Sequence, residues 1–166
     1  MINIYVHQHG ETKKAEQVDP AWLDPASAAI CWVDLAVPTD EEFRLLTDFF
    51  RFHPLSVEDA RSSLQFPKVE PYPGYLYMVL HCVDTMREHE HLITQDVDFF
   101  LGRNFLVTVH ADRSRTLDGL RQICDRSERV LAEGPVDEIR KLQADMDNYV
   151  SRLESVESGA PVASRP

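Results

Sequence analysis

Five short segments of this 166-residue chain carry the side-chain pattern of β-strands, so any fold it adopts must be built around a sheet. The first two alternate apolar and polar side chains with period two, and the last three are rich in β-branched and aromatic residues. These segments are residues 2–6, 30–35, 75–83, 93–101 and 105–110. Gly102-Arg103-Asn104 is a hairpin signal, and the charged residues 84–91 are typical of an exposed loop. The last three segments are therefore predicted to form an antiparallel meander.

Helix signals lie between these strands. Thr39 is placed to cap a helix, with Glu42 three residues later as its capping-box partner. Four apolar residues then fall on one helix face, namely Phe43, Leu46, Phe49 and Phe50. Pro54 is expected to end the helix after His53. A second, shorter helix is predicted over residues 55–61, and a third over residues 114–131, ended by Gly134-Pro135.

The last segment has a different period. Its apolar residues step by 3, 4, 3, 4 and 3, which is the a/d pattern of a coiled coil, at Ile139, Leu142, Met146, Tyr149, Leu153 and Val156. We therefore expect an α/β domain over residues 1–133, a mixed β-sheet covered by helices, followed by the start of a long stalk helix over 134–157. Residues 158–166 contain Gly159, Pro161 and Pro166 and are predicted to be a disordered tail.

Charge and apolar run length exclude several classes of function. The net charge of −11 repels a phosphate backbone and attracts cations, so we expect no nucleic-acid partner. The longest stretch without a charged residue, 71–83, is too short to cross a bilayer, and the first residues do not have the pattern of a signal peptide. Three scattered cysteines indicate buried thiols in a reducing compartment. We expect a cytoplasmic chain that does not itself insert into a membrane.

Enzymatic motifs are missing, so we expect no enzyme. The sequence has no glycine-rich phosphate loop, no G-x-S-x-G elbow and no H-E-x-x-H zinc motif. It has six glycines in all, which leaves little backbone for cradling a phosphate.

Metal ligation is the chemistry that an acidic chain with seven histidines suggests. The pairs His7-x-His9 and His89-x-His91 have no third ligand nearby, and we interpret them as solvated. Carboxylate pairs also occur, at Glu58-Asp59, Asp96-x-Asp98, Asp137-Glu138 and Asp145-x-Asp147, without the spacing of an EF-hand loop. Weak Mg²⁺ sites shared between two chains are the hypothesis that this pattern leaves open.

Several ordered motifs resemble the CorA-type divalent-cation channels. Residues 32–42, from Trp32 to Glu42, followed by 53–60, from His53 to Ala60, are similar to the start of that family's soluble domain. Residues 65–72, 101–110 and 147–154 follow in the family's order, with Phe66 where the family has an arginine. The resemblance covers about residues 30–157.

The resemblance implies a cytoplasmic domain that senses Mg²⁺, and also Co²⁺, and closes the pore of a pentameric channel. The family's pore helices, with their Gly-Met-Asn signature, do not occur in these residues, so this chain alone is expected not to transport. Its partners would be further copies or full-length subunits at the cytoplasmic face of the inner membrane. By motif match, Glu58 and Asp59 are the expected ligands of a regulatory ion between chains. Asp34, Pro38 and Lys68 are interpreted as turns and caps that define the fold.

Two alternatives stay open. A zinc-transporter domain of the ZntB type keeps the fold and gives the histidines, His89 and His91 above all, a role in binding Zn²⁺. A free-standing oligomerisation module keeps the fold and has no ion role.

Overall fold

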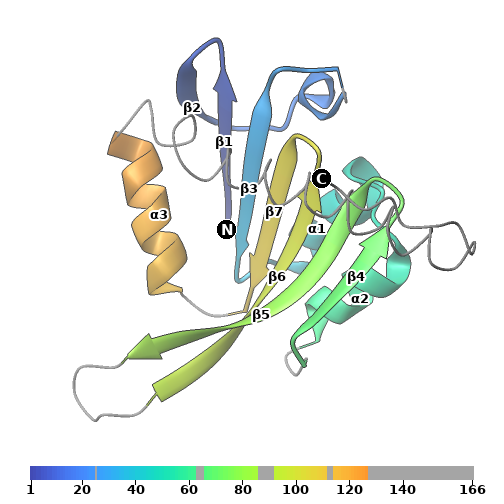
Figure 1. Ribbon diagram of the computed structural model, residues 1–166, viewed down its shortest axis with the longest axis vertical. Coiled ribbons are helices and arrows are strands. Elements are labelled where there is room, and N and C mark those ends of the chain that lie inside the picture. The colour runs from blue at the N-terminus through green and yellow to red at the C-terminus, as the bar shows by residue number, and fades with distance from the viewer. Residues whose placement is uncertain (25, 63–65, 86–91, 112–113, 127–166) are drawn as a thin grey trace, which may run out of the picture.

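A seven-stranded mixed sheet forms the centre of the molecule (Figure 1). The computed structural model describes residues 1–24, 26–62, 66–85, 92–111 and 114–126. In spatial order the strands are β2 (Glu11–Ala15), β1 (Ile2–Gln8), β3 (Ile30–Ala36), β7 (Phe105–His110), β6 (Leu92–Gly102), β5 (Tyr75–Thr85) and β4 (Lys68–Tyr72). Neighbouring strands are antiparallel except for β3 and β7, which run parallel. The mixed sheet and the antiparallel meander of β5, β6 and β7 are confirmed.

The long β5–β6 hairpin extends further than its sequence pattern indicates. Asp84 and Thr85 were expected in the charged loop, but they pair with Ile93 and Leu92 as the last residues of β5. The connection between these strands therefore begins after Thr85.

Two strands lack a clear pattern in the sequence, and both lie at the edges of the sheet. β2 is mostly charged and exposed, and it joins β1 through His9 and Gly10, whose φ angles are 55° and 81°. Positive φ at both central residues is the conformation that a tight two-residue hairpin requires. β4 contains Pro71, which an edge strand tolerates because one side of it has no strand partner.

The first predicted helix begins where the capping box places it, and it ends early. Thr39 accepts a hydrogen bond from the Glu42 backbone, and the Glu42 side chain accepts one from the Thr39 backbone. α1 (Asp40–Arg44) continues as the π-helical turn η2 (Leu45–Phe49). The prediction that it runs to His53 is wrong, because Arg51 has a φ of 56°, which ends a right-handed helix.

Pro54 begins the next helix and does not serve as a stop signal. α2 (Pro54–Arg61) follows directly, with proline at its first turn, where no amide hydrogen is needed. A short 3₁₀ helix, η1 (Pro20–Leu23), lies between β2 and β3. α3 (Arg115–Arg126) confirms the described part of the third predicted helix, and its remainder lies outside the described residues.

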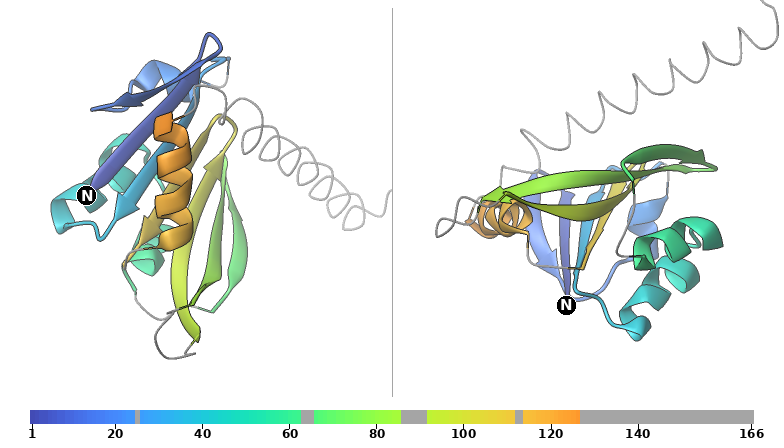
Figure 2. Two further views of the ribbon diagram at one scale, coloured as in Figure 1. Left: turned by 90° about the vertical axis from the view of Figure 1, so that its left-hand side faces the viewer. Right: turned by 90° about the horizontal axis from the view of Figure 1, so that it is seen from below.

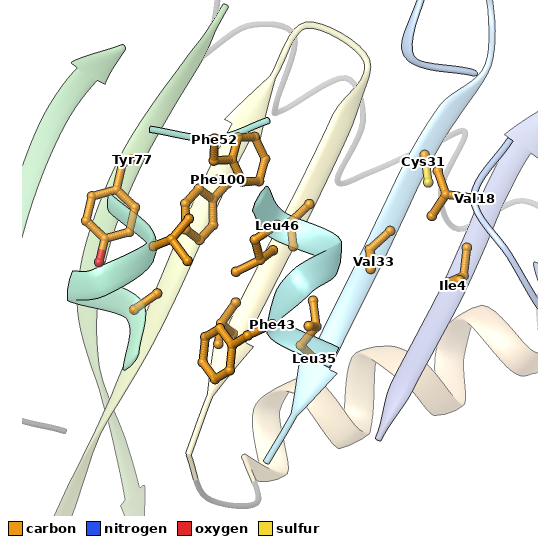
Figure 3. Close-up of a cluster of buried hydrophobic side chains, with 14 of the residues drawn as sticks. Ile4, Val18, Cys31, Val33, Leu35, Phe43, Leu46, Phe52, Tyr77 and Phe100 are labelled. Atoms are coloured by element: carbon orange, nitrogen blue, oxygen red, sulfur yellow. The ribbon is translucent and has the colours of Figure 1, made fainter. Parts of the chain in front are cut away.

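Helices cover both faces of the sheet, and each face has its own core (Figure 2). Aromatic and aliphatic side chains from α1, η2, α2 and the connection between η2 and α2 pack on one face, where Phe43, Leu46 and Phe52 meet Leu35 and Phe100 (Figure 3). On the other face, Tyr5 and Trp32 stack with ring centroids 5.4 Å apart beneath Leu117 and Cys124 of α3. The thiols of Cys31 and Cys124 are buried, and burial raises the pKa of Cys31 to about 12.

The predicted stalk helix over 134–157 and the tail over 158–166 lie outside the described residues, as do His89, His91 and the acidic pairs beyond residue 127. What was predicted for these residues therefore stays a prediction. In the portion of the chain that is described, no helix has the length and apolar character needed to cross a membrane.

Candidate functional site

Helix α2 carries the acidic pair that the sequence singles out. His53 caps the helix through Nδ1, which accepts from the Leu55 amide at 3.3 Å. Three residues on the inner side of the helix are buried against the sheet, namely Ser56, Val57 and Ala60. Glu58 therefore lies on the outer side, exposed to solvent, and Asp59 lies half-buried at the side of the helix nearest β4.

A lysine of the edge strand already pairs with Asp59. The Lys68 Nζ donates to the Asp59 carboxylate and also lies 3.3 Å from Glu70 Oε1. The hydrogen bond to Asp59, together with the charges of both carboxylates, raises the pKa of Lys68. This ion pair joins α2 to β4, and it places a tethered cation at the carboxylate that was expected to bind a metal.

A buried tyrosine and carboxyl group lie beneath this ion pair. Lys68 Nζ is 5.4 Å from the centre of the Tyr77 ring, and the Tyr77 hydroxyl donates to Asp98 on the neighbouring strand. Only 4% of Asp98 is exposed. Burial raises the pKa of Asp98 to about 6, with the charges of Asp96 and Asp59 adding to the rise. Burial likewise raises the pKa of Tyr77.

Further along the same strands, His81 Nε2 lies 3.2 Å from Asp96 Oδ1 across the β5–β6 pair. Acidic side chains thus follow one another from α2 across β4 to β6, and Lys68 balances part of their charge. We call this surface, made of Glu58, Asp59, Lys68, Glu70 and Asp96, the acidic surface; Asp98 lies buried beneath it.

The acidic surface attracts cations and does not form a finished cage within one chain. Among the described residues, no three histidine, cysteine or acidic side chains come together as metal ligands. Mg²⁺ prefers six oxygens in a near-octahedral arrangement. Glu58 and Asp59 could supply two, and the remainder would have to come from water or from another chain.

A second polar centre lies on the opposite face of the sheet, around Asp34. The buried Asp34 carboxylate accepts from Thr108 Oγ1 at 2.7 Å, lies 3.1 Å from His110 Nε2 and forms an ion pair with Arg121 of α3. Burial alone would raise the pKa of Asp34. The hydrogen bonds from His110 and Thr108 and the charges of His110 and Arg121 outweigh that effect, so the pKa lies below its ordinary value. This centre fixes α3 on the sheet.

Three residues were interpreted as turns and caps, and the structure places one of the three at such a position. Pro38 does precede the helix cap at Thr39. Asp34 lies inside β3 and Lys68 begins β4, so for these two the expectation of a turn or cap is wrong. Both define the fold through ion pairs, with Arg121 and Asp59 respectively.

The sequence analysis did not identify Asp98 as a buried group, and it did not define the surroundings of the histidines. A charged residue in the apolar strand pattern of β6 was the available signal for Asp98. His7 ends up beside Thr12, with its Nδ1 3.0 Å from the hydroxyl oxygen, and His9 lies in the β1–β2 turn.

The chain matches known proteins over most of its length. The family model for "CorA-like Mg2+ transporter protein" matches residues 27–157. The protein named "Putative metal ion transporter YfjQ" from Bacillus subtilis (strain 168) is 37% identical over 123 residues, which are 74% of this chain and 35% of that protein. The chain thus spans about a third of the length of this relative.

Solved structures share the fold at low identity. The CorA magnesium transporter from Methanocaldococcus jannaschii matches with a TM-score of 0.64 and 16% identity, over 96% of this chain and 50% of that one. The ZntB cytoplasmic domain from Vibrio parahaemolyticus RIMD 2210633 matches with a TM-score of 0.62 and 13% identity, over 92% of this chain and 62% of that one. With the family match over residues 27–157, these findings establish that the chain belongs to the family of CorA-like Mg²⁺ transporter proteins.

Proposed function

We propose that this chain is the divalent-cation-sensing part of a CorA-like magnesium transporter. It would lie on the cytoplasmic side of the membrane, with the pore formed by segments other than these residues. Its role is regulatory binding of Mg²⁺, and of Co²⁺ as a second ion, and not catalysis. Family membership supports the transporter assignment.

The observation that carries the sensing role is the position of the acidic pair on α2. Glu58 is exposed and Asp59 is partly exposed, so a neighbouring molecule can reach both carboxylates, in competition with Lys68 at Asp59. A carboxylate pair inside the core could not meet a second chain, whereas this pair belongs to α2, a helix that lies outside the sheet (Figure 1).

A shared ion would act by balancing repulsion between acidic subunits. Each chain carries a net charge of −11, so identical chains repel one another when they approach. A divalent cation held between Glu58 and Asp59 of one chain and oxygens of the next offsets that repulsion. Loss of the ion favours separated subunits, which is how ion concentration would select between two arrangements of the assembly. The partners are copies of this chain or full-length subunits, arranged as a homopentamer.

Lys68 sets the threshold of such a sensor. Its ammonium group neutralises Asp59 when no ion is present, so an incoming cation competes with a tethered one. Competition of this kind produces weak binding, which suits an ion present at high concentration in cells.

Sedimentation velocity with and without Mg²⁺ tests the proposal. We expect millimolar Mg²⁺ to shift the wild-type chain to a larger assembly and Glu58→Gln/Asp59→Asn to abolish that shift. Glu16→Gln/Glu41→Gln removes the same number of charges from other exposed positions, and it should leave the shift intact. An equal shift in all three proteins would contradict the assignment of Glu58 and Asp59.

The same experiment separates the competing functions. Lys68→Gln should lower the Mg²⁺ concentration at the midpoint, and Lys14→Gln at the far edge of the sheet should not. If Zn²⁺ binds tightly and the binding is lost in His89→Ala/His91→Ala, the zinc-transporter alternative is favoured. If no divalent ion changes the assembly state or the protease resistance, the chain is an oligomerisation module without an ion role.

A further inference from the structure

A buried carboxyl group lies under the charged contacts of the acidic surface. Asp98 of β6 stands opposite Val79 of β5 and Val109 of β7, and both valines belong to the core on the sheet face that carries α2. Residues directly opposite one another on neighbouring strands share a face of the sheet. Asp98 is 4% exposed, so little water reaches it, and a carboxyl group in such surroundings favours its neutral form.

Two side chains connect Asp98 to the candidate ion ligand on α2. The Tyr77 hydroxyl donates to Asp98 Oδ1, and the Tyr77 ring stands on the sheet face that carries α2 (Figure 3). The Lys68 Nζ lies 5.4 Å from the centre of that ring and donates to the Asp59 carboxylate. Tyr77 and Lys68 thus separate the two carboxyl groups, and Lys68 is the charge through which a change at Asp59 reaches Asp98.

Charges of both signs act on Asp98. Burial, the largest cause, raises the pKa of Asp98 to about 6, and the charges of Asp96 and Asp59 add to the rise. The hydrogen bond from Tyr77 and the positive charge of Lys68 oppose it. On this face β7 presents the apolar Val109 opposite Asp98. The titratable and charged groups on the other elements around Asp98 are Tyr77 and His81 of β5, Lys68 and Glu70 of β4, Asp96 of β6 and Asp59 of α2.

A divalent cation at Asp59 changes this balance in one direction. It brings two positive charges to the acidic surface, and it displaces the Lys68 ammonium from Asp59 toward its other neighbours, Glu70 and the Tyr77 ring. Added positive charge favours the ionised form of a nearby carboxyl group. Coupling between two binding equilibria is reciprocal, so an ionised Asp98 strengthens cation binding by the same factor.

We propose that Asp98 is a proton site linked to the ion site at Glu58 and Asp59, so that ion binding releases a proton and acidification weakens ion binding. The inference rests on the proposed function, because it requires an ion at that pair. When the ion binds, the O–H bond of the neutral Asp98 acid breaks, its electron pair stays on the carboxylate, and the proton passes to water. The sensor then responds less to the same Mg²⁺ concentration in an acidified cell than in a neutral one.

Sedimentation velocity at a fixed chain concentration, at pH 7.5 and pH 5.5, measures the effect on ion binding. A coupling of about tenfold between the two sites, with Asp98 half-protonated near pH 6, raises the midpoint Mg²⁺ concentration about threefold between these pH values. We expect that rise in the wild-type chain. Asp98→Asn has nearly the same shape and no proton to release, and it should lose the rise. Glu16→Gln, at the far edge of the sheet, should keep it.

Carboxyl ¹³C NMR of aspartate-labelled chain measures the linkage at Asp98 itself. The resonance that is missing from Asp98→Asn identifies the group. Its titration midpoint should move to lower pH in millimolar Mg²⁺, and this movement should be lost in Glu58→Gln/Asp59→Asn. With no divalent ion present, Lys68→Gln should move the midpoint to higher pH, because Asp98 loses a positive neighbour, and Lys14→Gln should leave it in place.

A second variant covers the case in which Asp98→Asn does not fold. Tyr77→Phe removes the hydroxyl that donates to Asp98 and leaves the carboxyl group itself unchanged. Because that hydrogen bond favours the ionised form, its loss should shift the pH at which Mg²⁺ binding weakens to a higher value. An unchanged pH dependence in Tyr77→Phe would count against the proposal.

The outcomes separate this linkage from the function on which it rests. A chain that responds to Mg²⁺ through Glu58 and Asp59, with an Asp98 titration that Mg²⁺ leaves unchanged, refutes the linkage and leaves the proposed function intact. An equal rise of the midpoint in wild type and Asp98→Asn also refutes the linkage, since other groups then carry the pH dependence. A wild-type chain that does not respond to Mg²⁺ at either pH refutes the proposed function and the linkage with it.

Discussion

Replacing Asp98 by asparagine should remove a specific part of the pH dependence of stability. Asp98 is buried under Tyr77, and its pKa rises from 3.8 to about 6 in the folded protein. The folded chain therefore holds a proton that the unfolded chain releases, over the window between those two pKa values. Because the unfolded state binds fewer protons there, the free energy of unfolding falls as pH rises through the window.

The size of the effect follows from the two pKa values. A carboxyl group with a pKa near 6 when folded and 3.8 when unfolded makes the protein about 1.4 kcal/mol more stable at pH 5 than at pH 8. For a chain of this size, 1 kcal/mol corresponds to roughly 2–4 °C in melting temperature. The contribution of Asp98 is thus about 3–6 °C between these two pH values.

Thermal melting of the wild type, Asp98→Asn and an exposed control, Glu16→Gln, at pH 5 and pH 8 measures this. All other titrating groups are common to the three proteins, so they cancel in the difference between pH profiles. We expect Asp98→Asn to lose about 3–6 °C of the pH-dependent difference and Glu16→Gln to keep it. Parallel profiles for wild type and Asp98→Asn would refute the reasoning, since they would mean that Asp98 has an ordinary pKa when folded.

Three further substitutions address other parts of the fold. Arg121→Met leaves the Asp34 carboxylate buried without its guanidinium partner, and it should lower the free energy of unfolding in urea by about 3–5 kcal/mol. The double variant Asp34→Asn/Arg121→Met should lose less than the sum of the two single changes. Additive losses would argue against the ion pair. Thr39→Ala removes the helix cap and should lower stability by about 1 kcal/mol, while Thr39→Ser should retain most of it. His9→Asn places a residue that better tolerates positive φ in the β1–β2 turn and should raise the melting temperature slightly, so a decrease would contradict the turn assignment.

Local signals in the sequence were sufficient for most of the elements. The capping box at Thr39 and Glu42 acts within four residues, and the strand patterns of β1, β3, β5, β6 and β7 depend on side chains that are near neighbours in the chain. Edge strands carry weaker signals, because water covers part of their surface and polar residues are tolerated there. For that reason β2, with its two lysines, and β4, with Pro71, were not predicted.

The sequence predicted where the candidate site lies in the chain, but it did not predict which side chains pair within the site. The motif placed Glu58 and Asp59 on a short helix, which the structure confirms. It gave no sign that Lys68 would pair with Asp59 or that Asp98 would lie beneath them, because those contacts form only when β4, β5 and β6 align. Their regulatory role stays a proposal.

The amino-acid sequence by itself determined most of the strands and helices, though not the edge strands β2 and β4, together with the acidic character of the chain and its family motifs, because these depend on neighbouring residues and on composition. The tertiary structure alone decided which charges meet. Asp34 and Arg121 are 87 residues apart in the chain, and Tyr77 and Asp98 are 21 apart. Burial changes the pKa of a carboxyl group only after distant strands exclude water around it, and no local pattern records that event.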